Sequence, residues 1–217
     1  MYLYQFLRKT FLLGLFSITS LTHANETKPT KVLFIGDSIT QGYGLPREAA
    51  YPAIVAEMLA EEGILINVQN AGVNGQTIAG GASSLKWQAK MSDYDVLVIL
   101  LGGNDALRGN YAQNFNAMYE DYKNLIEMSF ESHPNAPVLV CRMMAPTNMG
   151  KAYIEGFNKV FKRIEEDKRI TMTAFILEGV ATITEMNQAD GIHPNHKGHK
   201  KIAENLYIPL KKVIVKQ

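Results

Sequence analysis

Five residues spread along the chain have the types that serine-type ester hydrolysis requires. Ser38 lies in the run G-D-S-I-T, Gly75 in N-A-G-V-N-G-Q-T, and Asn104 in G-G-N-D, while Asp190 and His193 share D-G-I-H-P-N. The chemistry needs a nucleophile, an imidazole base within hydrogen-bonding reach, a carboxylate that orients the imidazole, and donors for an oxyanion. Ser38 is the candidate nucleophile, and the other four could supply the remaining groups.

Three of these positions directly follow segments that are typical of buried strands. Val32–Ile35 is an unbroken apolar run that ends in G-D-S, and 95–101 is the most apolar run after the N-terminal leader and ends in G-G-N-D. Residues 64–69 form a shorter strand that leads to Gly75. Because parallel strands of an open α/β sheet end at the same edge, we expect the five residues to converge there.

The rest of the chain alternates strands with helices. Further strands are expected at 137–144 and 173–177. Helical spacing of apolar residues predicts helices at 51–59, closed by Gly63, at 114–132, at 153–168, and around Ile202, Ala203 and Leu206 with an interruption near Pro209. This rhythm predicts a three-layer αβα fold, flavodoxin-like, with a doubly wound parallel five-stranded sheet. No repeat or linker is visible, so residues 25–217 are predicted to form one domain.

The first 24 residues resemble a secretory signal peptide. Arg8 and Lys9 precede the apolar run 11–21, and small residues lead to Ala24, after which we expect cleavage. The apolar run is too short to span a bilayer comfortably. The protein is therefore expected to be exported, to the periplasm or the medium, without a stable membrane anchor.

Composition excludes several partners and cross-links. The chain has 22 basic and 21 acidic side chains, which gives no field suited to nucleic acid. Cys141 is the only cysteine, so no intramolecular disulfide is possible, and its apolar surroundings indicate a buried, inert thiol. No exposed apolar stripe stands out, and we expect a monomer or a weak oligomer.

Taken together, the four motifs resemble the blocks of the SGNH, or GDSL-type, hydrolases, and within them the thioesterase I / lysophospholipase L1 / arylesterase group. The blocks follow in the same order and cover nearly all of the chain after residue 24. The resemblance implies that Ser38 is the nucleophile, His193 the general base and Asp190 its orienting partner. It places the oxyanion donors at the backbone N–H groups of Ser38 and Gly75 and at the side-chain amide of Asn104. It implies no metal and no organic cofactor.

The second block departs from the family pattern. Relatives commonly carry G-V-S-G-E/D-T there, whereas this chain has Asn74 and Gln76 at the polar positions. The change replaces a possible carboxylate with amides, so the rigidity of this loop and the response to pH are expected to differ.

The substrate is expected to be a small-molecule acyl ester or thioester. Aryl esters, acyl thioesters and lysophospholipids are all compatible with the resemblance, and a carbohydrate or other short-chain acetylesterase on the same fold is the alternative. Six residues near the blocks could line an acyl groove: Ile39, Leu107, Met144, Pro146, Met149 and Ile192.

Other interpretations of these residues remain open. Asp37 could shape an Asx-turn, and Asn104 and Asp105 could cap the segment that follows them. His193, His196 and His199 with Asp190 could bind a metal in a phosphoesterase, although we expect His196 and His199 to be exposed on the first turns of the last helix. A non-catalytic acyl-binding module is the remaining possibility.

Overall fold

The sheet of this protein has five parallel strands in the order β2-β1-β3-β4-β5. The structure is a computed structural model and describes residues 28–216. The strands are β1 (Thr30–Gly36), β2 (Ile66–Gly72), β3 (Val96–Leu100), β4 (Val138–Arg142) and β5 (Ile170–Phe175). In the register of the central strands, Phe34 pairs with Asn70 on one side and with Val98 on the other. This strand order is the flavodoxin-like doubly wound one, which confirms the predicted fold class.

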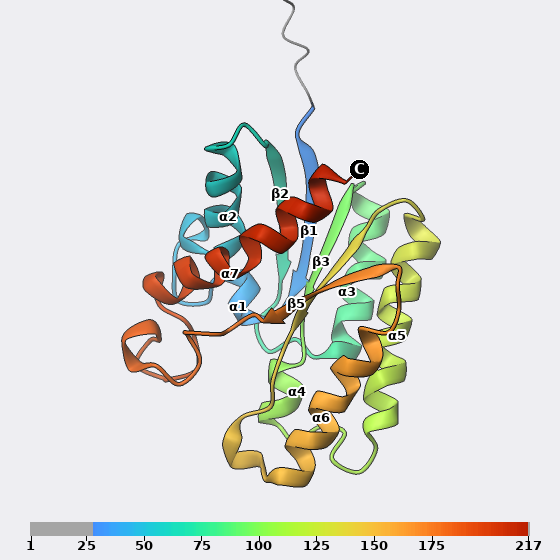
Figure 1. The fold of residues 1–217 in the computed structure, drawn as a ribbon, viewed down its shortest axis with the longest axis vertical. Helices are drawn as coiled ribbons and strands as arrows, with labels where there is room; N and C mark the ends of the chain where they lie inside the picture. Colours follow the sequence, from blue (N-terminus) through green and yellow to red (C-terminus); the bar gives the residue numbers. More distant parts are fainter. Residues whose placement is uncertain (1–27, 217) are drawn as a thin grey trace, which may run out of the picture.

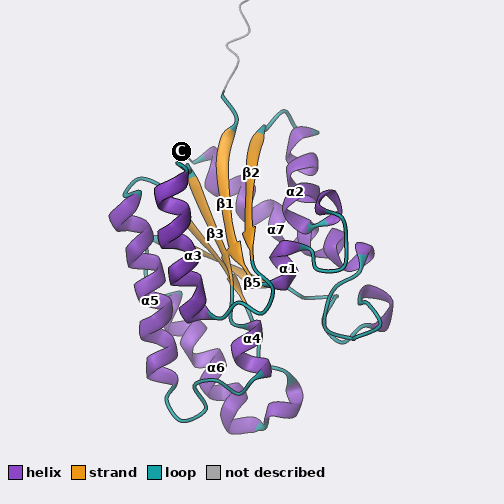
Figure 2. Cartoon of the chain, turned by 180° about the vertical axis from the view of Figure 1, so that it is seen from behind, coloured by secondary structure: helices purple, strands orange, loops and turns teal. Residues whose placement is uncertain are grey.

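Helices cover both faces of the sheet. On one face lie α2 (Tyr51–Ala60) and α7 (His196–Val215), and on the other α3 (Ile78–Met91), α5 (Phe115–Ser132) and α6 (Lys151–Ile164), as Figures 1 and 2 show from opposite sides. Two short helices, α1 (Ser38–Gln41) and α4 (Gly103–Leu107), directly follow β1 and β3. Short 3₁₀ turns occur at Arg47–Ala49, Thr147–Met149 and Thr184–Met186.

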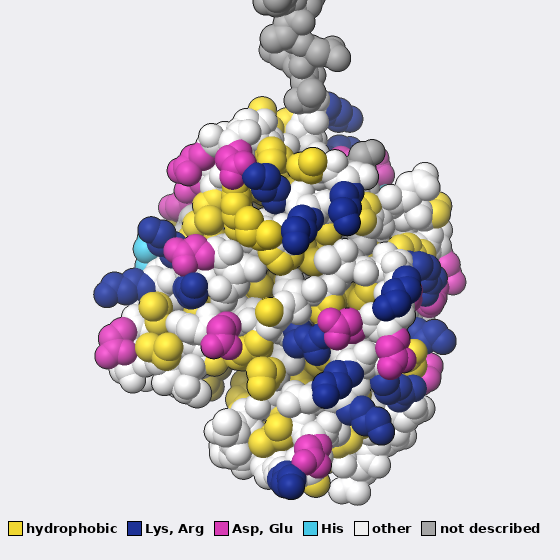
Figure 3. All heavy atoms as spheres, viewed as in Figure 1, with side chains coloured by type: hydrophobic (Ala, Val, Ile, Leu, Met, Phe, Trp, Pro, Cys, Tyr) yellow, Lys and Arg dark blue, Asp and Glu magenta, His cyan; other side chains and the backbone are white. Residues whose placement is uncertain are grey.

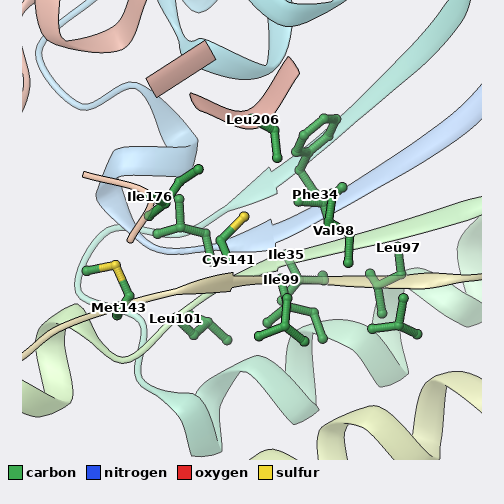
Figure 4. Packing of buried hydrophobic residues seen from close by; sticks show 14 of the residues in the cluster. Phe34, Ile35, Leu97, Val98, Ile99, Leu101, Cys141, Met143, Ile176 and Leu206 are labelled. Atoms are coloured by element: carbon green, nitrogen blue, oxygen red, sulfur yellow. The ribbon is translucent and has the colours of Figure 1, made fainter. Parts of the chain in front are cut away.

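The core consists of the strands and the helix faces packed on them. Val32–Ile35 of β1 and every residue of β3 are buried, as expected for strands covered on both faces. In Figure 4, Phe34 points toward Leu206 of α7, whereas Leu97, Ile99 and Leu101 point toward the helices of the opposite face. Cys141 of β4 is fully buried, and burial raises the pKa of its thiol, in agreement with the predicted inert role.

Helix α3 is the largest element that the sequence did not predict. Its segment contains Gly80, Gly81 and two serines, which are weak helix formers. A side chain on Gly81 would overlap Leu101, so the glycine lets α3 approach the end of β3 closely. Packing on the sheet therefore outweighs low helix propensity here. β5 also begins three residues earlier than predicted, at Ile170, and ends at Phe175.

Helix α7 runs through Pro209, so the predicted interruption is wrong. A proline inside a helix removes one hydrogen bond, to the carbonyl of Asn205 in this case. Leu206, Leu210 and Val213 are nevertheless buried on both sides of the proline and belong to the same core. The apolar area that they bury offsets the missing bond.

The predicted signal peptide, residues 1–24, lies outside the described residues. Within 28–216, no helix combines the length and the apolar character that a membrane span requires. The face formed by α2 and α7 carries interspersed basic and acidic side chains (Figure 3). This face has no extended field of one sign.

Candidate functional site

The candidate residues gather at the edge of the sheet toward which all five strands point. Ser38 is the first residue of α1, immediately beyond β1, and Asn104 lies in α4, just beyond β3. Both therefore lie in short helices rather than at the last residue of a strand. Gly75 lies in the loop between β2 and α3. The predicted convergence is confirmed, because Ser38, Gly75, Asn104 and His193 line one cavity.

The turn that presents Ser38 depends on two neighbours. Asp37 is the N-cap of α1, and its Oδ1 accepts a hydrogen bond from the backbone N–H of Ile39 at 2.9 Å. This is the geometry of an Asx-turn, as the sequence suggested. A side-chain carbon on Gly36 would lie 3.0 Å from the carbonyl oxygen of Leu100 and would overlap Thr40. Glycine at this position therefore lets the chain turn tightly against β3.

Asp190, His193 and Ser38 form a continuous hydrogen-bonded chain. Nδ1–H of His193 donates to Oδ2 of Asp190 at 2.7 Å, and Nε2 of His193 lies 2.9 Å from Oγ of Ser38. With Nδ1 as the donor, the neutral imidazole has a free lone pair on Nε2, which accepts the hydroxyl proton. This arrangement can activate the hydroxyl of Ser38 as a nucleophile.

Asp190 is held as a carboxylate by its neighbours. The hydrogen bond from the His193 ring, followed by the backbone N–H groups of His193 and Ile192 on its Oδ1, lowers the pKa of Asp190 to about 2. An ionised Asp190 keeps the proton of the imidazole on Nδ1. The tautomer that leaves Nε2 free is thereby favoured.

The loop that carries Asp190 and His193 is fixed by its own hydrogen bonds. The backbone N–H of Gln188 donates to the carbonyl of His193 at 2.8 Å, and the side-chain amide of Gln188 donates to the carbonyl of Tyr43 at 2.7 Å. Asn195 caps α7 by accepting from the N–H groups of Lys197 and Gly198. The ring of Tyr43 lies 4.5 Å from that of His193, between centroids. The imidazole is therefore oriented from several sides.

The amide of Asn104 points into the same region but already has two acceptors. Its Nδ2 donates to the carbonyl of Gln76 at 3.1 Å and to Oδ2 of Asp37 at 3.3 Å. Gly75 adopts φ = 75°, a conformation that glycine tolerates without strain. Asn104 and the backbone of the Gly75 loop are thus linked before any ligand binds.

The amides that depart from the family pattern have different environments. Gln76 is buried, donates to the carbonyl of Gly36 at 3.1 Å and accepts from Ser84 at 2.7 Å. It therefore connects the end of β1 to α3. Asn74 is exposed and lines the cavity.

The cavity has a volume of about 300 Å³. Three of the residues predicted for an acyl groove, Ile39, Leu107 and Ile192, line it, whereas Met144, Pro146 and Met149 do not. A role for those three in substrate binding stays a prediction. The remaining lining residues are Asp37, Asn74, Gly103 and Arg108.

Arg108 and Asp37 have site positions that the sequence did not indicate. The place of Arg108 three residues after the motif G-G-N-D was the only available signal for it. Asp37 is 2 % exposed, and burial raises its pKa to about 6, against the opposing effects of the Ile39 N–H and of His193. The carboxyl behind the nucleophile is therefore easier to protonate than an ordinary aspartate.

Asp105 links two elements of the site region rather than capping the segment that follows it. Its Oδ2 accepts from the backbone N–H of Ile78, in the first turn of α3, at 3.0 Å, and its Oδ1 accepts from Asn110 at 3.1 Å. Burial raises its pKa. Asp105 therefore connects α4 to the start of α3.

The histidine tract does not form a cluster. His196 is exposed, as predicted, but the prediction for His199 is wrong, because His199 is 1 % exposed. Its Nδ1 accepts from the backbone N–H of Tyr51 at 3.2 Å, and burial lowers its pKa to about 4. Within residues 28–216, no three His, Cys, Asp or Glu side chains are grouped so that they could hold a metal ion.

A larger cavity, of about 540 Å³, lies at the opposite end of the sheet. It is bordered by residues 93–95 and 132–136. His133 there pairs with Asp93 at 3.1 Å and stacks on Tyr94, but the hydroxyl of the neighbouring Ser132 donates to the backbone carbonyls of Met128 and Ser129 and not to His133. The smaller cavity at Ser38 is therefore the better candidate for chemistry.

Comparisons with known proteins show the family of the chain. Residues 34–201 match the model of the GDSL-like lipase/acylhydrolase family. The chain is 32 % identical over 209 residues to an esterase, TesA, of Pseudomonas aeruginosa, covering 96 % of this chain and all of the relative. It is 30 % identical over 189 residues to an arylesterase of Vibrio mimicus, covering 87 % and 90 %.

Solved structures of esterases have the same fold as this chain. A crystal structure of TesA superposes with a TM-score of 0.78 at 32 % identity and covers 85 % of this chain and 99 % of its own. A psychrotrophic esterase, EstA, of Pseudoalteromonas superposes with a TM-score of 0.77 at 26 % identity, with 86 % and 99 % covered.

Proposed function

The chain belongs to the GDSL-like lipase/acylhydrolase family and is an ester hydrolase, and on this premise we propose that it cleaves carboxylic esters and acyl thioesters through an acyl-serine intermediate on Ser38. The observation that carries the proposal is the hydrogen-bonded chain from Asp190 through His193 to Ser38. Each distance in this chain is within the range that direct proton transfer needs.

The first half of the reaction forms the acyl-enzyme. Nε2 of His193 takes the hydroxyl proton as Oγ of Ser38 attacks the carbonyl carbon, and the electron pair of the C=O bond moves to the oxygen. The N–H groups of Ser38 and Gly75 and the amide of Asn104 are the donors for this oxyanion. Asn104 becomes available when one amide hydrogen leaves Asp37, the more distant of its two acceptors. His193 then protonates the departing alcohol or thiol.

The second half releases the acid. Water gives a proton to His193 and attacks the acyl carbon, and the imidazolium returns that proton to Ser38 as the acid leaves. Asp190 stays ionised throughout and stabilises the imidazolium. The residues of the cavity thus complete the cycle with water as the only other reactant.

The lining of the cavity supports a small acyl group as the bound part of the substrate. Ile39, Leu107 and Ile192 provide apolar contacts close to Ser38, and the volume of about 300 Å³ suits a short or medium chain. Among the similar proteins are an esterase, an arylesterase and, at 28 % identity, a thioesterase 1/protease 1/lysophospholipase L1 of Escherichia coli. A broad range of leaving groups is expected on this basis.

The N-terminal leader supports export, without a membrane anchor after cleavage. Fractionation of cells that express the full chain tests this part. A protein shortened by the leader is expected in the periplasm or medium, and a full-length protein that stays with the membranes would contradict it.

The main test compares the protein with its Ser38→Ala variant. Both are assayed on p-nitrophenyl esters and acyl thioesters of increasing chain length, and both are treated with a fluorophosphonate probe. Ser38→Ala is expected to lower kcat by at least about 10³-fold and to abolish labelling. Ser83→Ala, at an exposed serine of α3, is the matched control and should retain both properties. Undiminished hydrolysis or labelling in Ser38→Ala would exclude the acyl-serine mechanism.

A further inference from the structure

Arg108 is a cationic residue of the catalytic cavity that the proposed mechanism does not use. It follows the last residue of α4, is exposed, and lines the cavity together with Ser38 and Asn104. One of its guanidinium nitrogens lies 3.2 Å from the position that a side-chain carbon on Gly75 would occupy. The guanidinium therefore lies against the residue whose N–H is the proposed oxyanion donor.

The charge of Arg108 has no partner of opposite charge in contact with it. Arg142 and Arg169 form ion pairs with carboxylates, and Arg163 binds Asn116. Among the described residues, none forms an ion pair or hydrogen bond with Arg108. Its positive charge is therefore available to a ligand of the cavity.

The other ionisable groups around Arg108 have hydrogen-bond partners of their own. Asp37 and Asp105 are both buried, and burial raises the pKa of each. Arg108 acts electrostatically on Asp105 and opposes part of that rise. His193, which also lines the cavity, is paired with Asp190. Arg108 is the cation on the Gly75 side.

A cation at this place acts differently on the substrate and on the transition state. The carbonyl oxygen of a neutral ester carries only a partial charge, whereas the tetrahedral intermediate carries a full negative charge on the same atom. A fixed positive charge beside Gly75 therefore stabilises the transition state more than the bound substrate, and such a difference raises kcat.

We propose that Arg108 is a further catalytic residue, whose guanidinium stabilises the negative charge that develops on the substrate oxygen beside Gly75. The inference rests on the proposed acyl-serine mechanism. It adds a charged group to the three neutral donors of that mechanism. Because the guanidinium is exposed, its contribution is expected to be moderate and sensitive to salt.

The first test measures kcat and KM for a neutral ester, p-nitrophenyl butyrate, with Arg108→Met, Arg108→Gln and Arg108→Lys. The two neutral replacements are expected to lower kcat about tenfold with KM within twofold, since one charge a few ångströms from the oxyanion in a partly hydrated cavity has this size of effect. Arg108→Lys should retain most of the activity. Arg47→Met is the matched control, because Arg47 is also exposed and lies outside the catalytic cavity.

The second test uses an alkyl boronic acid, which mimics the charged intermediate. Oγ of Ser38 adds to boron, its proton passes to His193, and the boron becomes tetrahedral and negatively charged. The inhibition constant should rise in Arg108→Met by the factor by which kcat/KM falls, and not in Arg47→Met. The loss of kcat/KM and the loss of boronate affinity in Arg108→Met should both become smaller as the salt concentration is raised from about 0.02 M to about 0.5 M.

The outcomes separate this inference from the proposed function. Each Arg108 variant is labelled with the fluorophosphonate probe, with and without the Ser38→Ala substitution. Labelling that is lost only when Ser38 is replaced shows that the acyl-serine mechanism is intact. With that labelling intact, unchanged boronate affinity in Arg108→Met and Arg108→Gln would overturn the role of Arg108. A raised KM for the neutral ester at unchanged kcat would overturn it too, because the residue would then act in binding. If Arg108→Lys lost as much activity as the neutral variants, and if salt did not change that loss, Arg108 would have a structural role instead.

Discussion

Asn104 meets two requirements with one side chain. Its amide must point at the substrate oxygen, and it must keep that direction while the cavity is empty. The carbonyl of Gln76 and the carboxylate of Asp37 hold the amide from two sides, at 3.1 and 3.3 Å. Only the longer bond, to Asp37, is exchanged for the substrate oxygen, so the amide reorients little during the reaction, and such preorganised oxyanion donors have large effects on rate.

Asn104→Ala is therefore expected to lower kcat by about 10²- to 10³-fold while KM changes little. Steady-state kinetics on a p-nitrophenyl ester checks this expectation. Asn110→Ala is the control, because Asn110 also donates to a buried aspartate, Asp105, but does not line the cavity. Equal losses in the two variants would mean that Asn104 acts on the fold and not on the oxyanion.

The sequence predicted the site where chemistry restricts the residue type. Roles for Ser38, Asp190 and His193 could be predicted from the resemblance of four ordered motifs, and the structure brings these three side chains into one hydrogen-bonded chain. His199 was assigned wrongly, because the lysines around it suggested an exposed turn. Its spacing of three, four and seven residues from Ile202, Ala203 and Leu206 places it on the buried face of α7, and this signal was available. A role for Arg108 could not be predicted, because it depends on the contact with Gly75 in the folded protein, and the spacing of residues in the sequence does not reveal that contact.

At the scale of elements, the strands β1, β3 and β4 and the helix α5 could be predicted because their patterns are strong. Asn114, the predicted start of α5, is its N-cap and accepts from the N–H of Ala117. Helix α3 could not be predicted, because its contact with Leu101 through Gly81 depends on the assembled sheet. The helix interruption predicted at Pro209 was wrong for a related reason: the missing backbone hydrogen bond is a local effect, and tertiary packing of α7 opposes it.

Pro209→Ala tests this interpretation of α7. Alanine restores an N–H for the carbonyl of Asn205 and favours the helix, which outweighs the loss of proline's restraint on the unfolded chain. The free energy of unfolding is expected to rise by about 1–2 kcal/mol, as measured by urea denaturation. Lys200→Ala, at an exposed position of the same helix, should change it by less than about 0.5 kcal/mol. A destabilised Pro209→Ala protein would show that the ring of Pro209 is needed for packing.

At the scale of the whole molecule, two buried ionisable groups respond to pH in opposite directions. Asp37 has its pKa raised from 3.8 to about 6, so the folded state binds more protons than the unfolded state between these values. The stabilisation that this gives is present below pH 3.8 and is lost as the pH rises through 6. His199 has its pKa lowered from 6.5 to about 4, so its stabilisation is present above pH 6.5 and is lost as the pH falls through 4.

Because these windows overlap, the two contributions oppose each other between pH 4 and 6, each with a size of up to about 3 kcal/mol. The variants Asp37→Asn and His199→Asn separate them, the second keeping an acceptor for the N–H of Tyr51. Urea unfolding is measured for the protein and both variants at pH 4 to 7, and each variant is compared with the protein at the same pH, so that all other titrating groups cancel. On acidification, the relative free energy of unfolding should fall for Asp37→Asn and rise for His199→Asn. Changes in the same direction, or no change in either, would contradict the opposed titration, because burial would then not disfavour the charged form at both positions.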